Sequence, residues 1–226
     1  MDEAEWLACG NPREMLESFL RGPVFIPKLG RFTSVRVSCR KLRLFAAACY
    51  RRIWHLLTQE YSRKAVEVAE QLAEGRASHR EVFPLLVATS RDNTLQARLG
   101  ESAILADAFT AACSGSSETV VAAAMKDRQA MWTVRDIEWT AQSALLRDIF
   151  GPLPFRPVRF DLTWLTPDVV TLAGHIYHDR AFDRMPELAD ALEEAGCDNA
   201  DILSHLRGPG PHVRGCWVID LLLGKE

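Results

Sequence analysis

Two cysteines and two histidines lie near the C-terminal end of the sequence, and their thiolate and imidazole groups are both zinc ligands. Their spacing is Cys197-x7-His205-x6-His212-x3-Cys216. Zinc takes four such ligands in a tetrahedron. In a helix running from about 212 to 223, His212 and Cys216 would share one face, because residues four apart lie above one another. The pattern predicts a structural zinc site, and zinc is the one cofactor that the sequence suggests.

The same four residues also fit a C-terminal region without a metal. Cys197 follows Gly196, a glycine suited to ending a helix, and Cys216 has the size of a small core residue. The two histidines would then lie at the surface or cap helices. The spacing matches no standard zinc finger, and no pair of cysteines forms a Cys-x-x-Cys motif. Both interpretations stay open at this point.

A second candidate metal site lies in the segment GHIYHDRAFD. His175 and His178 fall on one face of an expected helix, and Asp179 is adjacent. A His-Asp dyad of this kind holds metals in one class of helical phosphohydrolases, where further ligands come from other helices. The sequence offers no place for those further ligands, so a solvent-facing histidine pair is the alternative.

Basic residues gather in the expected basic helix at 36–52, where they could contact the phosphates of a nucleic acid. They are Arg40, Lys41, Arg43, Arg51 and Arg52. Acidic residues dominate the neighbouring helices, and arginines beside aromatic side chains often cover a helical core with their aliphatic stems. The net charge of −3 gives no general attraction to phosphate. Nucleic-acid binding is therefore an alternative and not the leading expectation.

The composition is that of an ordinary globular protein, with 226 residues, 48% of them hydrophobic and 25% charged. The N-terminal segment lacks the apolar core of a signal peptide. No apolar run approaches the roughly 18 residues needed to span a bilayer. Six cysteines without a tight framework suit a reducing compartment. We expect a cytoplasmic protein without a membrane segment.

Helix signals occur along nearly the whole chain and predict an all-α multi-helix bundle. Residues 92–113 and 117–150 have the pattern of two long alanine-rich helices that pack as an antiparallel pair. Capping residues, among them Thr166 and Asp198, predict four short helices nearer the C-terminus. The segment 23–37 carries β-branched residues between proline and glycine, which predicts a loop or a short hairpin.

A proline-rich connector at 151–159, with three prolines, is the clearest joint in the chain. It predicts a helical bundle at 1–150 and a C-terminal unit of short helices at 160–226. The C-terminal unit is expected to pack on the bundle, and the two can form a single domain.

Six stretches of the sequence resemble a large paralogous family of uncharacterised bacterial proteins. They are EAEWLACGNPREML, RKLRLFAAACYRRIWHLLT, AVEVAEQLAEG, LLRDIFGPLPFRPV, AFDRMPELADALEEAGC and HLRGPGPHVRGCWVIDLLLGKE. The resemblance covers most of 1–22, 38–75 and 143–226, whereas 23–37 departs from the family and about 79–140 matches only in being helical and alanine-rich. It implies that the C-terminal unit is a signature of the fold or of its site. It brings no known activity, cofactor or catalytic residue.

Together these observations favour a non-enzymatic helical module that binds another protein, and a second hypothesis adds a structural zinc ion to that module. The sequence contains no G-x-S-x-G motif, glycine-rich phosphate loop or H-E-x-x-H motif. A metal-dependent hydrolase and a nucleic-acid-binding protein are the alternatives. The identity of the partner and the oligomeric state are not set by the sequence.

Overall fold

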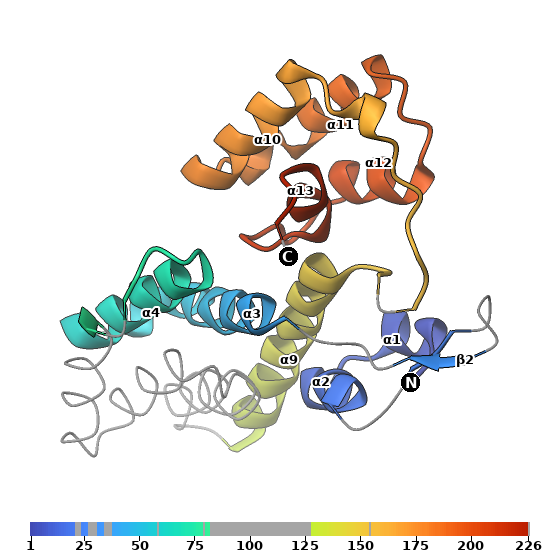
Figure 1. Ribbon diagram of the computed structural model, residues 1–226. Coiled ribbons are helices and arrows are strands. Elements are labelled where there is room, and N and C mark those ends of the chain that lie inside the picture. The colour runs from blue at the N-terminus through green and yellow to red at the C-terminus, as the bar shows by residue number, and fades with distance from the viewer. Residues whose placement is uncertain are drawn as a thin grey trace.

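The computed structural model confirms the all-α fold class (Figure 1). It describes residues 1–20, 24–26, 31–33, 38–57, 59–78, 80–81, 128–153 and 155–225. The expected long helix at 92–113 lies outside the described residues. Of its expected partner at 117–150, residues 117–127 also lie outside them, and the remainder is α9.

The α-helices have six to 23 residues and make up most of the described chain, and a short strand pair interrupts them. Of these helices, none is both long and apolar enough to cross a membrane. The helices and strands are α1 (Glu3–Ala8), α2 (Pro12–Leu20), β1 (Val24–Ile26), β2 (Arg31–Thr33), α3 (Cys39–Arg52), η2 (Trp54–Leu56), α4 (Glu60–Ala73), α9 (Arg128–Phe150), η4 (Leu162–Trp164), α10 (Pro167–Asp179), η5 (Phe182–Arg184), α11 (Met185–Glu194), α12 (Ala200–Arg207) and α13 (Trp217–Leu222).

Strands β1 and β2 pair antiparallel, with Phe25 opposite Phe32. This is the short hairpin that the β-branched segment at 23–37 predicts. It adds a small β element beside the helices and takes no part in the candidate site described below.

Two large apolar cores organise the helices. The first lies among α1, α2, α3 and α9 and includes Trp6 and Phe155. The second lies among α10, α11, α12 and α13 and includes Trp217, with Val158 packed against it. The change from the first core to the second therefore falls within the connector at 151–159. The division of the chain into two units stays a prediction.

The two cores meet where α13 lies over the C-terminal end of α9 (Figure 1). Gly151, which follows α9, adopts a φ of +55°, and a Cβ added there would lie 2.5 Å from the ring of Trp217. Arg40 of α3 donates two hydrogen bonds to Asp220 of α13, at 2.7 and 3.0 Å. The close approach of Gly151 and Trp217 places the start of α13 against the end of α9, and the Arg40–Asp220 pair holds α13 to α3.

Candidate metal centre

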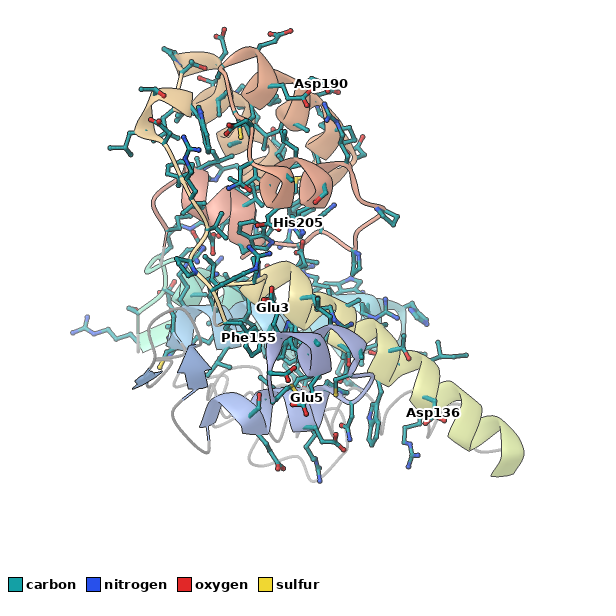
Figure 2. The ribbon with its side chains drawn as sticks, turned by 90° about the vertical axis from the view of Figure 1, so that its right-hand side faces the viewer. Glu3, Glu5, Asp136, Phe155, Asp190 and His205 are labelled. Atoms are coloured by element: carbon teal, nitrogen blue, oxygen red, sulfur yellow. The ribbon has the colours of Figure 1, made fainter. Side chains whose placement is uncertain are left out.

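Four side chains with metal-binding atoms meet at this junction. Asp148 lies in the last turn of α9, and His205 lies in the last turn of α12. His212 lies in the loop that follows α12, and Cys216 directly precedes α13. One ligand atom from each residue lies within 4.8 Å of the others. In Figure 2, His205 lies between the C-terminal helices and the end of α9.

The loop between α12 and α13 turns the chain back toward α9. Gly210 in this loop has a φ of +80°, and an added Cβ would lie 2.9 Å from the backbone nitrogen of His212. A residue with a side chain would therefore be strained at this position. The expected helix from about 212 to 223 is wrong at its start, because α13 begins at Trp217. The preceding residues form the loop that carries His212 to Asp148.

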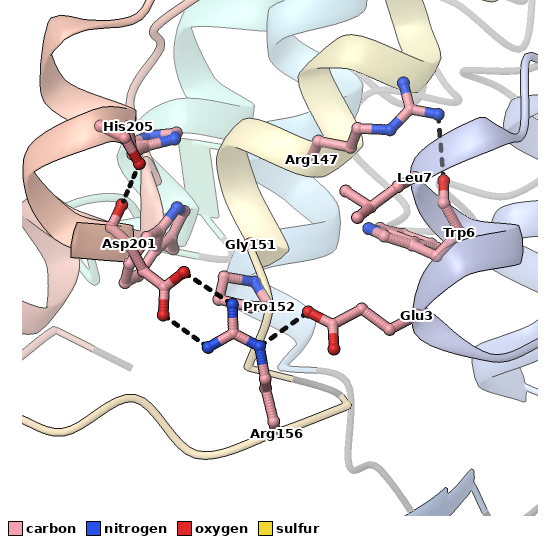
Figure 3. A pocket seen from close by; sticks show the side chains of 11 residues that line it. Glu3, Trp6, Leu7, Arg147, Gly151, Pro152, Arg156, Asp201 and His205 are labelled. Carbon is pink, nitrogen blue, oxygen red and sulfur yellow. Dashed lines mark hydrogen bonds and ion pairs between the residues drawn. The ribbon is translucent and has the colours of Figure 1, made fainter. Parts of the chain in front are cut away.

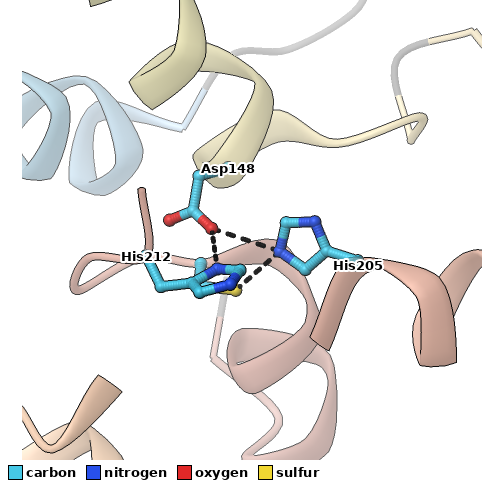
Figure 4. Close-up of side chains that lie close together, drawn as sticks. Asp148, His205 and His212 are labelled. Carbon is cyan, nitrogen blue, oxygen red and sulfur yellow. Dashed lines mark hydrogen bonds and ion pairs between the residues drawn. The ribbon is translucent and has the colours of Figure 1, made fainter. Parts of the chain in front are cut away.

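The ligand atoms converge on one point (Figure 4). His212 Nδ1 lies 2.8 Å from Asp148 Oδ1, and His205 Nε2 lies 3.1 Å from the same oxygen. His205 Nε2 also lies 3.2 Å from Cys216 Sγ. In a tetrahedron with zinc–ligand bonds of about 2.0–2.3 Å, neighbouring ligand atoms are about 3.3–3.8 Å apart. A small outward shift of these side chains would therefore admit an ion.

Backbone groups of the same loop hold the far atoms of two ligand side chains. Asp148 Oδ2 accepts a hydrogen bond from the Val213 N–H at 2.9 Å, which leaves Oδ1 facing the cluster. His212 Nε2 lies 3.4 Å from the Gly208 carbonyl oxygen, which leaves Nδ1 facing the cluster. Metal-ligating histidines and carboxylates are commonly held by such hydrogen bonds at their far atoms. The surroundings of Asp148 and His212 match that arrangement.

Burial and charge act in opposite directions on the site. Burial raises the pKa of Asp148, but hydrogen bonds with His205 and His212 outweigh it, so its pKa lies below the ordinary value. Burial lowers the pKa of His212, but the nearby Asp148 carboxylate has the larger, opposite effect. The pKa of His212 therefore lies above its ordinary value. Burial raises the pKa of the Cys216 thiol well above its ordinary value. A bound cation would reverse this last effect, because a thiol that coordinates a metal is deprotonated.

The arrangement differs from a catalytic Cys–His–Asp relay. In such a relay one imidazole nitrogen contacts the nucleophile and the other contacts the acid. Here the single atom His205 Nε2 lies near both Cys216 Sγ and Asp148 Oδ1. Proton transfer through the ring would need the two partners on opposite nitrogens. The geometry suits a shared ion and does not suit a thiol nucleophile.

The structure brings together three of the four predicted zinc ligands, which are His205, His212 and Cys216. Cys197 is not part of the cluster. It is 5% exposed, packs in the C-terminal core, and donates its backbone N–H to the Leu192 carbonyl at the end of α11. The position of Cys197 therefore supports a buried residue that binds no metal.

Asp148 supplies the fourth ligand atom and was not predicted from the sequence. It lies in LLRDIFG, where the side chains of Leu145, Leu146 and Ile149 are buried. A carboxylate among such buried apolar neighbours needs a compensating partner. An acidic residue among apolar neighbours at the end of a long helix is the sequence signal that could have identified it.

His175, His178 and Asp179 lie together on α10, as the sequence suggests, and all three are exposed. The Asp148 cluster is the one group of three or more potential metal ligands in the part of the chain that the structure describes. The α10 residues therefore gain no further ligand there, and the solvent-facing interpretation fits their position.

Four of the five basic residues predicted to contact nucleic acid make contacts within the chain. The pairs are Arg40 with Asp220, Lys41 with the Ile149 carbonyl, Arg51 with Glu70 and Arg52 with Glu138, at 2.7, 2.7, 3.0 and 3.3 Å. Arg43 is half-buried. This placement supports a structural role for the four paired cations.

Two pockets flank the cluster, and His205 lines both. The first, which we call the Trp pocket, has a volume of about 300 Å³ and includes Trp6 and Trp217 in its walls (Figure 3). The second, which we call the loop pocket, has a volume of about 260 Å³. It is lined by the loop at 208–211 and by Ala144, Arg147, Ser204, Asp148, His205 and His212.

Comparison of the chain with protein-family models, with curated proteins and with solved structures gave no match. The resemblance to a bacterial family stays a prediction.

Proposed function

We propose that this protein is a zinc-binding helical scaffold in which one ion clamps the C-terminal helices to α9. The convergence of a carboxylate, two imidazoles and a thiol within 4.8 Å carries the proposal. Asp148 comes from α9, which contributes to the first core, and Cys216 belongs to the second core. His205 comes from α12, which also contributes to the second core, and His212 comes from the loop between α12 and α13. An ion bound here would therefore link the two cores directly.

The mixture of ligand types favours zinc. Zinc accepts thiolate sulfur, imidazole nitrogen and carboxylate oxygen in one tetrahedral site. Magnesium and calcium prefer oxygen ligands alone, so two imidazoles and a thiol count against them. With Cys216 as thiolate, Asp148 ionised and both histidines neutral, the ligand charges balance a divalent ion.

Burial of the ligands supports a structural role for the ion. The side chain of Asp148 is 2% exposed and that of His212 is 8% exposed, and Cys216 is fully buried. Structural zinc sites fill their tetrahedron with four protein ligands, whereas catalytic sites keep one position for water. Four protein ligands are present here.

Chelation tests the proposal through thermal stability. A free zinc concentration of about 100 times the dissociation constant would stabilise the folded protein by about 2.7 kcal/mol. For a chain of this length that corresponds to a rise of about 5–11 °C in melting temperature. We expect a chelator to lower the melting temperature of the wild-type protein and added zinc to restore it.

Two buried cysteines provide matched variants for this experiment. Cys216→Ser removes a proposed ligand, whereas Cys197→Ser alters a buried thiol outside the cluster. The melting temperature of Cys197→Ser should still respond to chelator and zinc, and that of Cys216→Ser should not. A zinc response that survives in Cys216→Ser and disappears in Cys197→Ser would refute the assignment.

Binding to another protein stays a prediction of the sequence, as does the cytoplasmic location. The most exposed large apolar side chains among the described residues are Leu7, Ile137 and Leu162. They lie on α1, α9 and η4 respectively, and single exposed apolar residues are common on protein surfaces. These exposed residues therefore do not favour protein binding over the proposed metal site as the function.

A further inference from the structure

The ligands of the proposed ion are not equally enclosed. Asp148, His205 and His212 line the loop pocket, whereas Cys216 does not and is fully buried. The side chain of His205 is the most accessible of the four, at 19% exposed. An ion at this site would therefore have a buried thiolate side and a side that borders the loop pocket.

The charges around the loop pocket favour an anion. Asp148 is the one acidic residue among those that line the pocket, and the bound ion would neutralise its negative charge. Arg147 lines both pockets and, within the described residues, donates its hydrogen bonds to the backbone carbonyls of Trp6 and Cys9. Its positive charge is therefore not matched by a carboxylate in these contacts. Arg156 of the Trp pocket differs, because it pairs with carboxylates (Figure 3).

The size of the loop pocket limits the ligand to a small molecule. Its volume of about 260 Å³ lies just below the range of roughly 300–1,000 Å³ that is typical for drug-sized ligands. Acetate, phosphate and small carboxylic acids fit within such a volume. Zinc expands from four to five ligands in some sites. At this site the added ligand would approach from the side of the loop pocket, where His205 is 19% exposed, and would not need to displace a side chain.

We propose that the ion bound by Asp148, His205, His212 and Cys216 takes a small oxyanion, a carboxylate or a phosphate, as an exchangeable fifth ligand from the loop pocket, a role that rests on the metal site proposed above. The anion oxygen binds the ion, and Arg147 draws the anion to the pocket by its charge. No covalent bond of the anion is made or broken.

Cobalt substitution tests this role, because the visible absorption of Co²⁺ reports its coordination number. The full-length protein is loaded with Co²⁺ and titrated with sodium acetate and, separately, with sodium phosphate at constant ionic strength. We expect a saturable loss of absorption intensity as four-coordinate cobalt becomes five-coordinate. The two titrations distinguish a carboxylate site from a phosphate site.

Three arginine variants test the source of the anion preference. Arg147→Gln should weaken anion binding about tenfold at low ionic strength, and Arg147→Lys should restore most of it, because the charge is kept. Arg135→Gln is the matched control, since it removes the same charge from the same helix about 18 Å away. Its anion affinity should equal that of the wild-type protein.

Each failure of this experiment has a distinct meaning. Cobalt that binds with a spectrum indifferent to both anions would overturn the fifth-ligand role and leave the metal clamp intact. Equal anion affinity in Arg147→Gln and in the wild-type protein would overturn the assignment of the loop pocket. A protein that binds no cobalt would overturn the proposed function itself, and the fifth-ligand role with it.

Discussion

Replacing Gly151 by alanine tests how α13 is held against the end of α9. Gly151 has a φ of +55°, and the added methyl carbon would lie 2.5 Å from two ring atoms of Trp217. Trp217 is 2% exposed and directly follows the proposed ligand Cys216. The ring therefore cannot move away without disturbing both the C-terminal core and the start of α13.

Two costs add in this variant. The left-handed backbone conformation costs an alanine about 1–2 kcal/mol relative to glycine, and overpacking against a buried side chain costs about 1–3 kcal/mol more. The free energy of unfolding should therefore fall by about 2–5 kcal/mol. Gly75→Ala is the matched control, because Gly75 has a φ of +65° and no described atom within 4 Å of an added Cβ. It should lose only about 1–2 kcal/mol.

Urea denaturation followed by circular dichroism measures both losses, provided that the slope of unfolding free energy against urea is unchanged. Gly151→Ala should lose about 1–3 kcal/mol more than Gly75→Ala, which is the contribution of the clash with Trp217. Equal losses in the two variants would contradict the close contact between α13 and the end of α9.

Three further predictions concern charged side chains at the junction. Burial alone raises the pKa of Glu74, but hydrogen bonds and nearby cations hold it at about 2, below its ordinary value of 4.5. The stabilisation from the ionised Glu74 is therefore complete above about pH 4.5 and is lost as the pH falls toward 2. Glu74→Gln should make the free energy of unfolding, measured with urea, fall less steeply over this acidic range. Asp220→Asn should lower the free energy of unfolding by about 1.5–3 kcal/mol, because the half-buried Arg40 guanidinium loses its two-pronged carboxylate partner but keeps Glu74 at 3.1 Å. Asp201→Asn should cost less than about 1 kcal/mol, because the Arg156–Asp201 pair is about one third exposed; a loss as large as that of Asp220→Asn would show that exposure does not govern these ion pairs.

Local chemistry predicts much of the helical fold. Thr166 caps α10 as expected, since its side chain accepts the N–H of Val169 and a proline follows it. At α12 the expected cap is Asp198, whereas the structure uses Asn199, whose side chain accepts two backbone N–H groups. Aspartate and asparagine cap helices almost equally well, so sequence alone cannot separate two adjacent candidates.

The site could be predicted only where its residues are close in sequence. His205, His212 and Cys216 share one short segment, so their ligand types and spacing suggest a metal. Asp148 belongs to a different helix, and its role depends on which face of α9 meets the loop. The Arg40–Asp220 pair could not be predicted for the same reason, since 180 positions separate the two residues in the sequence. Contacts of this kind depend on tertiary packing and leave no periodic pattern in the chain.

Metal content is the most direct test of the central claim. Elemental analysis by mass spectrometry would be run on the wild-type protein, Cys216→Ser, Asp148→Asn and Cys197→Ser after loading with zinc and removal of the excess. The proposed centre predicts about one zinc per chain in the wild-type protein and in Cys197→Ser, and a large loss of zinc in Cys216→Ser and Asp148→Asn. A wild-type protein without zinc, or zinc that is lost in Cys197→Ser and kept in Cys216→Ser, would contradict it.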